Sequence, residues 1–147
     1  MSESEPKSWA LEVLVHDRRV ARNVARELNR LGAASVEFGQ GRGVDPHLPL
    51  TIFATVSSVA VIGSLALSWV QRRGCQVILD VRGGKVRKEV DCRVRDGRLI
   101  IIAVDGISVQ ITDAPQLVDL TSIINAAITA GSDAVKALAT ASGARVD

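Results

Sequence analysis

Hydrophobic residues follow three patterns along the chain. Trp9–Val15 is rich in residues that favour strands, and residues 17–31 repeat apolar positions at helical spacing. A long uncharged run follows at Leu48–Val70, and from Cys75 onward short apolar segments alternate with glycine-containing turns. Together these patterns predict an α+β protein.

The first part, residues 8–46, is predicted to be a small β-α-β unit. Trp9–Val15 is its first strand, a helix follows from Asp17 to Leu31, and Ala34–Phe38 is its second strand. One helix stripe is apolar and consists of Val20, Val24, Leu28 and Leu31. Such a unit is too small to bury both sheet faces by itself.

A polar segment precedes this unit, and a glycine-rich segment follows its second strand. Residues 1–7 are predicted to be a disordered lead-in. Gly39–Gly43 contains closely spaced glycines, but Val44 stands where a dinucleotide-binding fingerprint needs its third glycine. This segment is therefore interpreted as a connector, not as a phosphate-binding loop.

The run Leu48–Val70 contains 23 residues without a charge and is predicted to form one helix that begins near Pro49. Its length suits a lipid bilayer. Six of its residues are Ser or Thr, which favours a helix surrounded by protein (Thr51, Thr55, Ser57, Ser58, Ser64, Ser68). The alternative is a single-pass inner-membrane span, anchored by Trp69 and Arg72-Arg73, with the C-terminal part in the cytoplasm.

Three turn signals predict a four-stranded antiparallel meander that packs on this helix, together forming residues 47–112. They are Gly83-Gly84, Asp96-Gly97 and Asp105-Gly106. The first turn pairs Val77 with Val90 and Cys75 with Cys92. The two cysteines are interpreted as reduced, buried thiols, with a disulfide as the alternative.

The strand Leu99–Val104 is apolar on both sides, so the predicted sheet needs two covers. One apolar side is left for the C-terminal segment or a second subunit. We therefore predict a protein–protein interface on this side, formed by Ile100, Ile102, Val104, Ile107, Val109 and Ile111. Residues 113–147 are predicted to be a helical tail with helices over 116–130 and 133–141, the first capped by Asp113.

Charge is distributed unevenly although the net charge is only +2. Residues 72–98 carry nine basic and four acidic side chains, a net charge of +5, which is interpreted as a solvated strand face. The helix over residues 17–31 is rich in arginine, and nucleic-acid backbone binding is kept as an alternative function. Two Trp, two Phe and no Tyr argue against a base-stacking surface.

No catalytic, cofactor-binding or metal-binding residues are predicted. His16 and His47 lack a second histidine or a cysteine at ligand spacing, and no serine stands in a nucleophile elbow. The chain opens without the pattern of a signal peptide. These features predict a cytoplasmic protein that is not an enzyme.

Ser64–Arg73, running into the hairpin residues 77–84, resembles the effector-associated constant component family of bacterial conflict systems. The resemblance covers roughly residues 9–92 and includes an apolar helix that ends in Trp-x-x-Arg-Arg. It implies a non-catalytic accessory partner of a protease or other effector in defence signalling. The sequence thus favours an adaptor module that acts through contacts with another protein or a second copy.

Overall fold

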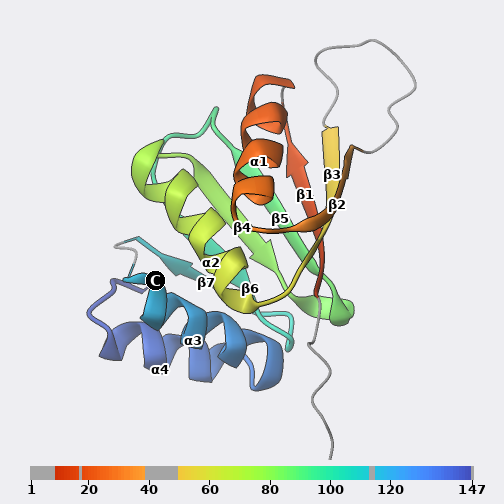
Figure 1. Ribbon diagram of the computed structural model, residues 1–147. Coiled ribbons are helices and arrows are strands. Elements are labelled where there is room, and N and C mark those ends of the chain that lie inside the picture. Colours follow the sequence, from red (N-terminus) through yellow and green to blue (C-terminus); the bar gives the residue numbers. More distant parts are fainter. Residues whose placement is uncertain (1–8, 17, 39–49, 113–114, 147) are drawn as a thin grey trace, which may run out of the picture.

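The computed structural model describes residues 9–16, 18–38, 50–112 and 115–146. Within these ranges the chain forms a seven-stranded mixed sheet with the strand order β2-β3-β1-β5-β4-β6-β7. The helices lie on one side of this sheet, as Figure 1 shows. The predicted four-stranded antiparallel meander with one central helix is therefore wrong, although the α+β class holds.

In the first half of the chain, strands and helices are interspersed. In the second half, the strands come first and the last two α-helices follow them. The strands are β1 (Trp9–Val15), β2 (Ala34–Phe38), β3 (Leu50–Val56), β4 (Gln76–Asp80), β5 (Val86–Asp91), β6 (Leu99–Ile102) and β7 (Ser108–Ile111). The α-helices are α1 (Arg18–Arg30), α2 (Val59–Leu67), α3 (Leu117–Thr129) and α4 (Ser132–Ala141). A π-helical turn, η1 (Ser68–Arg72), extends α2, and a 3-10 turn, η2 (Arg82–Gly84), closes the β4–β5 hairpin.

The uncharged run is not one helix. It contains the strand β3, then the break Ser57-Ser58, then α2 and η1. β-Branched and aromatic residues dominate its first part, and Ile52 and Ala54 are buried while Phe53 between them is 42% exposed. In the described residues, no helix is long and apolar enough to cross a membrane.

The two strands of the predicted β-α-β unit, β1 and β2, do not pair with each other. β3 lies between β1 and β2 and is antiparallel to both. On its other edge β1 pairs in parallel with β5. The predicted strands and helix of the β-α-β unit are confirmed as elements, but residues far along the chain complete the sheet. Segments 1–7 and Gly39–Gly43 lie outside the described residues.

The predicted register of the β4–β5 hairpin is confirmed. Val77 pairs with Val90, and Asp80 pairs with Arg87. Cys75 and Cys92 face each other at its end with their Cα atoms 4.3 Å apart and form a disulfide. The preferred interpretation as two free thiols is therefore wrong, because the register brings both sulfurs within bonding distance.

After β5 the chain crosses the end of β4 instead of folding back along β5. Gly97 donates a hydrogen bond to the Gly74 carbonyl, and Val77 donates one to the Arg98 carbonyl, at 3.0 Å each. β6 then pairs in parallel with β4, so Ile78 lies beside Ile100. Asp96-Gly97 is part of this crossing and not a hairpin turn.

The β6–β7 hairpin has a three-residue loop where a two-residue turn was predicted. Ile101 pairs with Val109, and Ala103 donates a hydrogen bond to Ile107 at 3.1 Å. Gly106 has a φ of +83°, which suits glycine. One extra loop residue moves every side chain of β7 to the opposite face. Val109 and Ile111 consequently lie in the core, each 0% exposed.

The C-terminal helices α3 and α4 cover the β6–β7 end of the sheet. α2 packs closely on α3, and a Cβ added to Gly63 would lie 3.1 Å from Cδ1 of Leu117. The covered face and the helices form one core that includes Val13, Leu28, Ile62, Leu79 and Ile124. The opposite sheet face carries no helix within the described residues and holds the half-buried side chains of Leu14, Ile78, Ile100 and Ile102.

Candidate functional site

A large pocket lies at the edge of the sheet where β1 and β5 end. These strands are parallel, so their carboxyl ends meet at one edge, and His16 follows β1 as Cys92 follows β5. α1 begins beside His16, and η1 ends at the same edge. The cavity has a volume of about 660 Å³, which lies in the range of small-ligand sites.

The described side chains that line this pocket include six basic groups and no carboxylate. We call it the arginine pocket and define it by His16, Arg19, Arg72, Arg73, Arg93 and Arg95. The arginines come from α1, from η1 and the residue after it, and from the loop after β5. The fold therefore gathers positive charge from three separate parts of the chain.

The apolar part of the wall consists of Trp69 and the disulfide. Trp69 is 1% exposed, and the guanidinium carbon of Arg73 lies 4.7 Å from the centre of its ring. This is a cation–π contact. The indole Nε1 has no hydrogen-bond partner within the described residues. Cys75 is 1% exposed and Cys92 is partly buried, so Cys92 is the more accessible cysteine of the pair.

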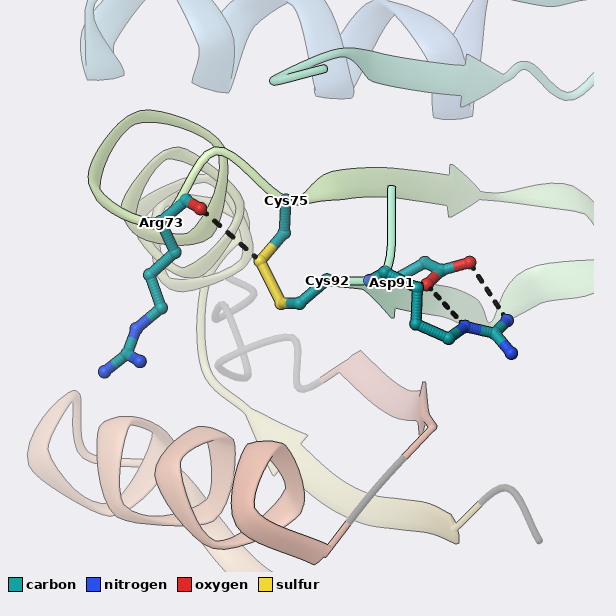
Figure 2. The surroundings of a disulfide bond; sticks show 5 residues. Arg73, Cys75, Asp91 and Cys92 are labelled. Carbon is teal, nitrogen blue, oxygen red and sulfur yellow. Dashed lines mark hydrogen bonds and ion pairs between the residues drawn. A yellow bond between two sulfur atoms is a disulfide. The ribbon is translucent and has the colours of Figure 1, made fainter. Parts of the chain in front are cut away.

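Arg93 is held at the rim by Asp91. Nε and Nη2 of Arg93 donate hydrogen bonds of 3.0 and 3.1 Å to the carboxylate, whose Oδ1 also accepts the Arg93 backbone N–H. Figure 2 shows Asp91 beside the disulfide. The hydrogen bonds from the Arg93 side chain lower the pKa of Asp91, although burial opposes them. Arg93 is therefore fixed in position and partly neutralised.

Arg19, Arg72 and Arg95 have no carboxylate within ion-pair distance in the described part of the chain. The first turn of α1, which carries Arg19, contains no acidic residue. The positive end of the helix dipole thus adds to the charge of these arginines. An anion that enters the pocket would meet these three guanidinium groups, which no carboxylate of the described residues binds.

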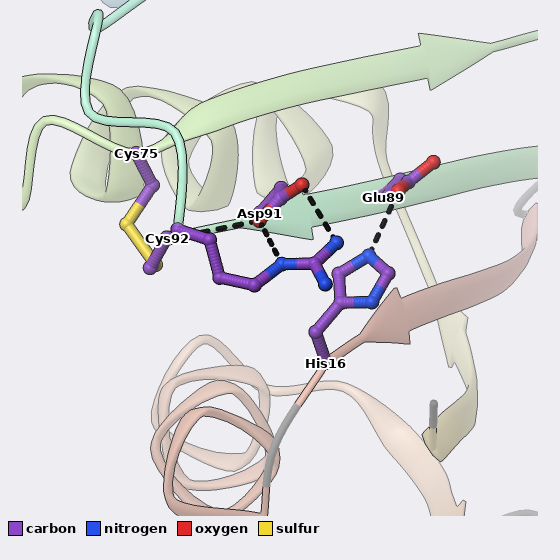
Figure 3. Close-up of polar contacts among 6 residues, drawn as sticks. His16, Cys75, Glu89, Asp91 and Cys92 are labelled. Atoms are coloured by element: carbon purple, nitrogen blue, oxygen red, sulfur yellow. Dashed lines mark hydrogen bonds and ion pairs between the residues drawn. A yellow bond between two sulfur atoms is a disulfide. The ribbon is translucent and has the colours of Figure 1, made fainter. Parts of the chain in front are cut away.

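His16, Glu89 and Asp91 form the one group of described residues that could hold a metal ion. Nε2 of His16 lies 2.9 Å from Oε2 of Glu89, and the three potential ligand atoms lie within 4.8 Å of one another. Figure 3 shows this cluster beside the disulfide. The Asp91 carboxylate is occupied by two hydrogen bonds from Arg93. Asp91 thus positions Arg93, and the cluster carries no metal assignment.

The six residues of the predicted interface are not brought together. Val109 and Ile111 are in the core, whereas Ile100 and Ile102 lie on the opposite sheet face. Val104 is 48% exposed and Ile107 is 51% exposed at the β6–β7 loop. None of the six lines the arginine pocket. His47 lies outside the described residues.

The basic charge of residues 72–98 is the sequence feature that belongs to this pocket. The net charge of +5 over residues 72–98 predicts a solvated strand face. The arginines of this segment are exposed, and four of them also line the pocket, beside Arg19 from the arginine-rich helix. The pocket could not be located because it depends on the parallel pairing of β1 with β5, which no local pattern encodes.

No protein-family model, no curated protein and no solved structure matches this chain. The resemblance based on Ser64–Arg73 therefore stays a hypothesis.

Proposed function

We propose that this protein is a non-catalytic interaction module that binds an acidic segment of a partner protein in the arginine pocket. The observation that carries the proposal is the convergence of five arginines and one histidine on a cavity without a lining carboxylate in the described chain. The five arginines are exposed, and holding like charges close together costs free energy, which a bound anion would recover. Guanidinium groups also bind carboxylates with two parallel hydrogen bonds.

The aromatic content favours an acidic peptide over a free nucleotide. Trp69 is the aromatic side chain that lines the pocket, and its ring is already covered by Arg73 at 4.7 Å. It therefore offers no free face on which a base could stack. Carboxylates need only the guanidinium groups.

The biological setting is proposed from the sequence alone. The resemblance to effector-associated constant components supports a cytoplasmic accessory role in bacterial defence or signalling. In that setting the acidic segment would belong to the effector. A homo-oligomer is compatible with the same role, since the open sheet face is separate from the pocket.

Nucleic-acid backbone binding is a second candidate, favoured by the exposed arginines of α1. Arg18, Arg22 and Arg26 are exposed and have no ion-pair partner among the described residues, and Arg30 pairs with Glu27 of the same helix. This row continues from Arg19 in the pocket. A phosphate backbone would follow the helix row, whereas an acidic peptide would require the pocket.

Two double variants with equal loss of charge separate these candidates. Arg72→Gln/Arg95→Gln changes the pocket, and Arg22→Gln/Arg26→Gln changes only the helix row. Binding of a fluorescein-labelled oligoglutamate peptide is measured by fluorescence anisotropy. We expect the pocket variant to lose at least about tenfold in affinity, because one charge-assisted hydrogen bond contributes more than 1 kcal/mol. The helix-row variant should lose less than about threefold.

The same titration with single-stranded oligothymidylate tests the second candidate. Tighter binding of oligothymidylate than of peptide, lost mainly in the helix-row variant, would favour nucleic-acid binding. Equal losses in both variants, or no binding of the peptide to the wild-type protein, would overturn the proposed role of the pocket.

A further inference from the structure

A disulfide forms part of the wall of the arginine pocket. Both Cys75 and Cys92 line it together with the five arginines. A disulfide is opened by a thiolate, which is an anion and must reach one sulfur from outside. The charged groups around this disulfide therefore determine whether an anionic or a cationic thiol attacks it faster.

We propose that Cys75–Cys92 is a site of thiol–disulfide exchange that prefers small thiols carrying carboxylates. The inference rests on the proposed function, because the same arginines that would hold an acidic peptide would attract and orient an anionic thiol. Electrostatic attraction raises the local concentration of an anion in a charged cleft. Cationic thiols are repelled by the same groups.

The two sulfurs differ in access, which fixes the direction of the exchange. Cys92 is partly buried, whereas Cys75 is 1% exposed, so the incoming thiolate attacks Sγ of Cys92. A mixed disulfide forms between the thiol and Cys92, and Cys75 leaves as a thiolate. Nearby guanidinium groups stabilise this thiolate before it takes a proton from solvent.

The thiol of reduced Cys75 has a hydrogen-bond acceptor nearby. Its Sγ lies 3.9 Å from the carbonyl oxygen of Arg73, and Figure 2 shows this contact. A disulfide sulfur has no hydrogen to donate, but the reduced thiol has one and can donate it to this carbonyl. The buried thiol is therefore satisfied after the exchange.

A second thiol completes the reaction. Its thiolate attacks the sulfur of the bound thiol, the new intermolecular disulfide departs, and Cys92 is released as a thiolate. In total two thiols are oxidised to one disulfide, and Cys75–Cys92 gains two electrons and two protons. The hairpin register between β4 and β5 does not depend on the disulfide, since backbone hydrogen bonds pair the two strands.

The test compares thiols of different charge on the wild-type protein. Cysteamine, 2-mercaptoethanol and mercaptosuccinate are cationic, neutral and anionic. The rate of appearance of the mixed disulfide and of free cysteines is followed by intact-mass spectrometry, and each rate is divided by the thiolate concentration. We expect mercaptosuccinate to react at least about tenfold faster than cysteamine at low salt. The difference should fall towards none in about 1 M salt, where charges are screened within about 3 Å.

Two variants complete the design. In Arg72→Gln/Arg95→Gln the preference for mercaptosuccinate should fall by about tenfold, while Arg22→Gln/Arg26→Gln should keep it. Equal rates per thiolate for the three thiols, or a preference that survives in the pocket variant, would overturn the inference.

The Cys75→Ser/Cys92→Ser variant separates this inference from the proposed function. If it binds oligoglutamate while the wild-type disulfide shows no charge preference, peptide binding stands and the exchange site is refuted. If the charge preference is present but no oligoglutamate binds, the exchange site stands without the proposed peptide function.

Discussion

The side chain of Lys88 is buried on the face of the sheet that the helices cover. It lies between Val13 of β1 and Leu79 of β4, is 1% exposed, and its Nζ has no hydrogen-bond partner among the described residues. Burial lowers the pKa of Lys88 well below its usual value of 10.5, although the charge of Glu27 on α1 opposes this shift. Desolvation prevails because Glu27 is not within ion-pair distance.

Replacing this amine by an apolar side chain of similar length should stabilise the protein. We expect Lys88→Met to raise the free energy of unfolding at neutral pH by about 1–3 kcal/mol, because a buried polar group without a partner costs that much. Urea unfolding followed by circular dichroism measures the difference. Lys85→Met, at an exposed position just before β5, is the matched control and should change stability little.

The pH dependence of unfolding gives an independent check on Lys88. Between the lowered folded pKa and 10.5, the unfolded chain binds a proton that the folded chain does not. The wild-type protein should therefore gain stability as the pH rises through this window. Lys88→Met should lack that gain. An identical slope in both proteins would mean that the amine is not buried.

At the scale of elements, one short motif recurs three times. Asp80-Val-Arg82, Asp91-Cys-Arg93 and Asp96-Gly-Arg98 each let the aspartate accept the backbone N–H of the arginine two residues later, at 3.0–3.1 Å. This is a local turn stabilised by the aspartate side chain. The pattern is visible in the sequence and indicates a local turn, but it occurs at the β4–β5 hairpin as well as at the crossing after β5, so it does not distinguish the two.

Asp105 joins the β6–β7 loop to the start of α4. Its Oδ2 accepts hydrogen bonds from the backbone N–H and the hydroxyl of Ser132, at 3.0 and 2.8 Å, and its Oδ1 accepts the Ile107 N–H. The bonds from Ser132, the backbone N–H first, lower the pKa of Asp105 from 3.8. A depressed folded pKa contributes stability above pH 3.8 and loses it as the pH falls through the folded pKa.

We expect Asp105→Asn to unfold at a lower urea concentration at pH 7 than the wild-type protein. The variant should also lose part of the acid-induced destabilisation that the lowered pKa of Asp105 predicts for the wild-type protein. The amide keeps one acceptor oxygen but has no charge to lose. Asp133→Asn, in the first turn of the same helix, is the control, since it changes the same charge without a contact to the β6–β7 loop in the described structure. Equal changes in the two variants would contradict the bridging role of Asp105.

At the scale of the whole molecule, local patterns were sufficient for some elements and not for others. α1, α3 and the β4–β5 register followed from spacing and turn residues. Leu48–Val70 did not, because its first half becomes a strand only through pairing with β1 and β2. The mixed sheet and the arginine pocket both depend on the parallel pairs β1–β5 and β4–β6, which join residues far apart in the sequence.

The arrangement of the helices on one face can be tested with two neighbouring isoleucines of β6. Ile101 is 0% exposed on the covered face, whereas Ile102 is half-buried on the opposite face. Ile101→Ala should lower the free energy of unfolding by about 2–5 kcal/mol, the usual cost of a cavity in a core. Ile102→Ala removes the same atoms from a partly solvated site and should cost about 1 kcal/mol or less.

Urea unfolding of both variants at several protein concentrations decides the question. A large loss for Ile101→Ala with a small loss for Ile102→Ala is the result expected for a sheet covered on one side. Equal losses that grow with protein concentration would contradict it. They would mean that a second copy buries Ile102, because only an associated state gains stability with concentration.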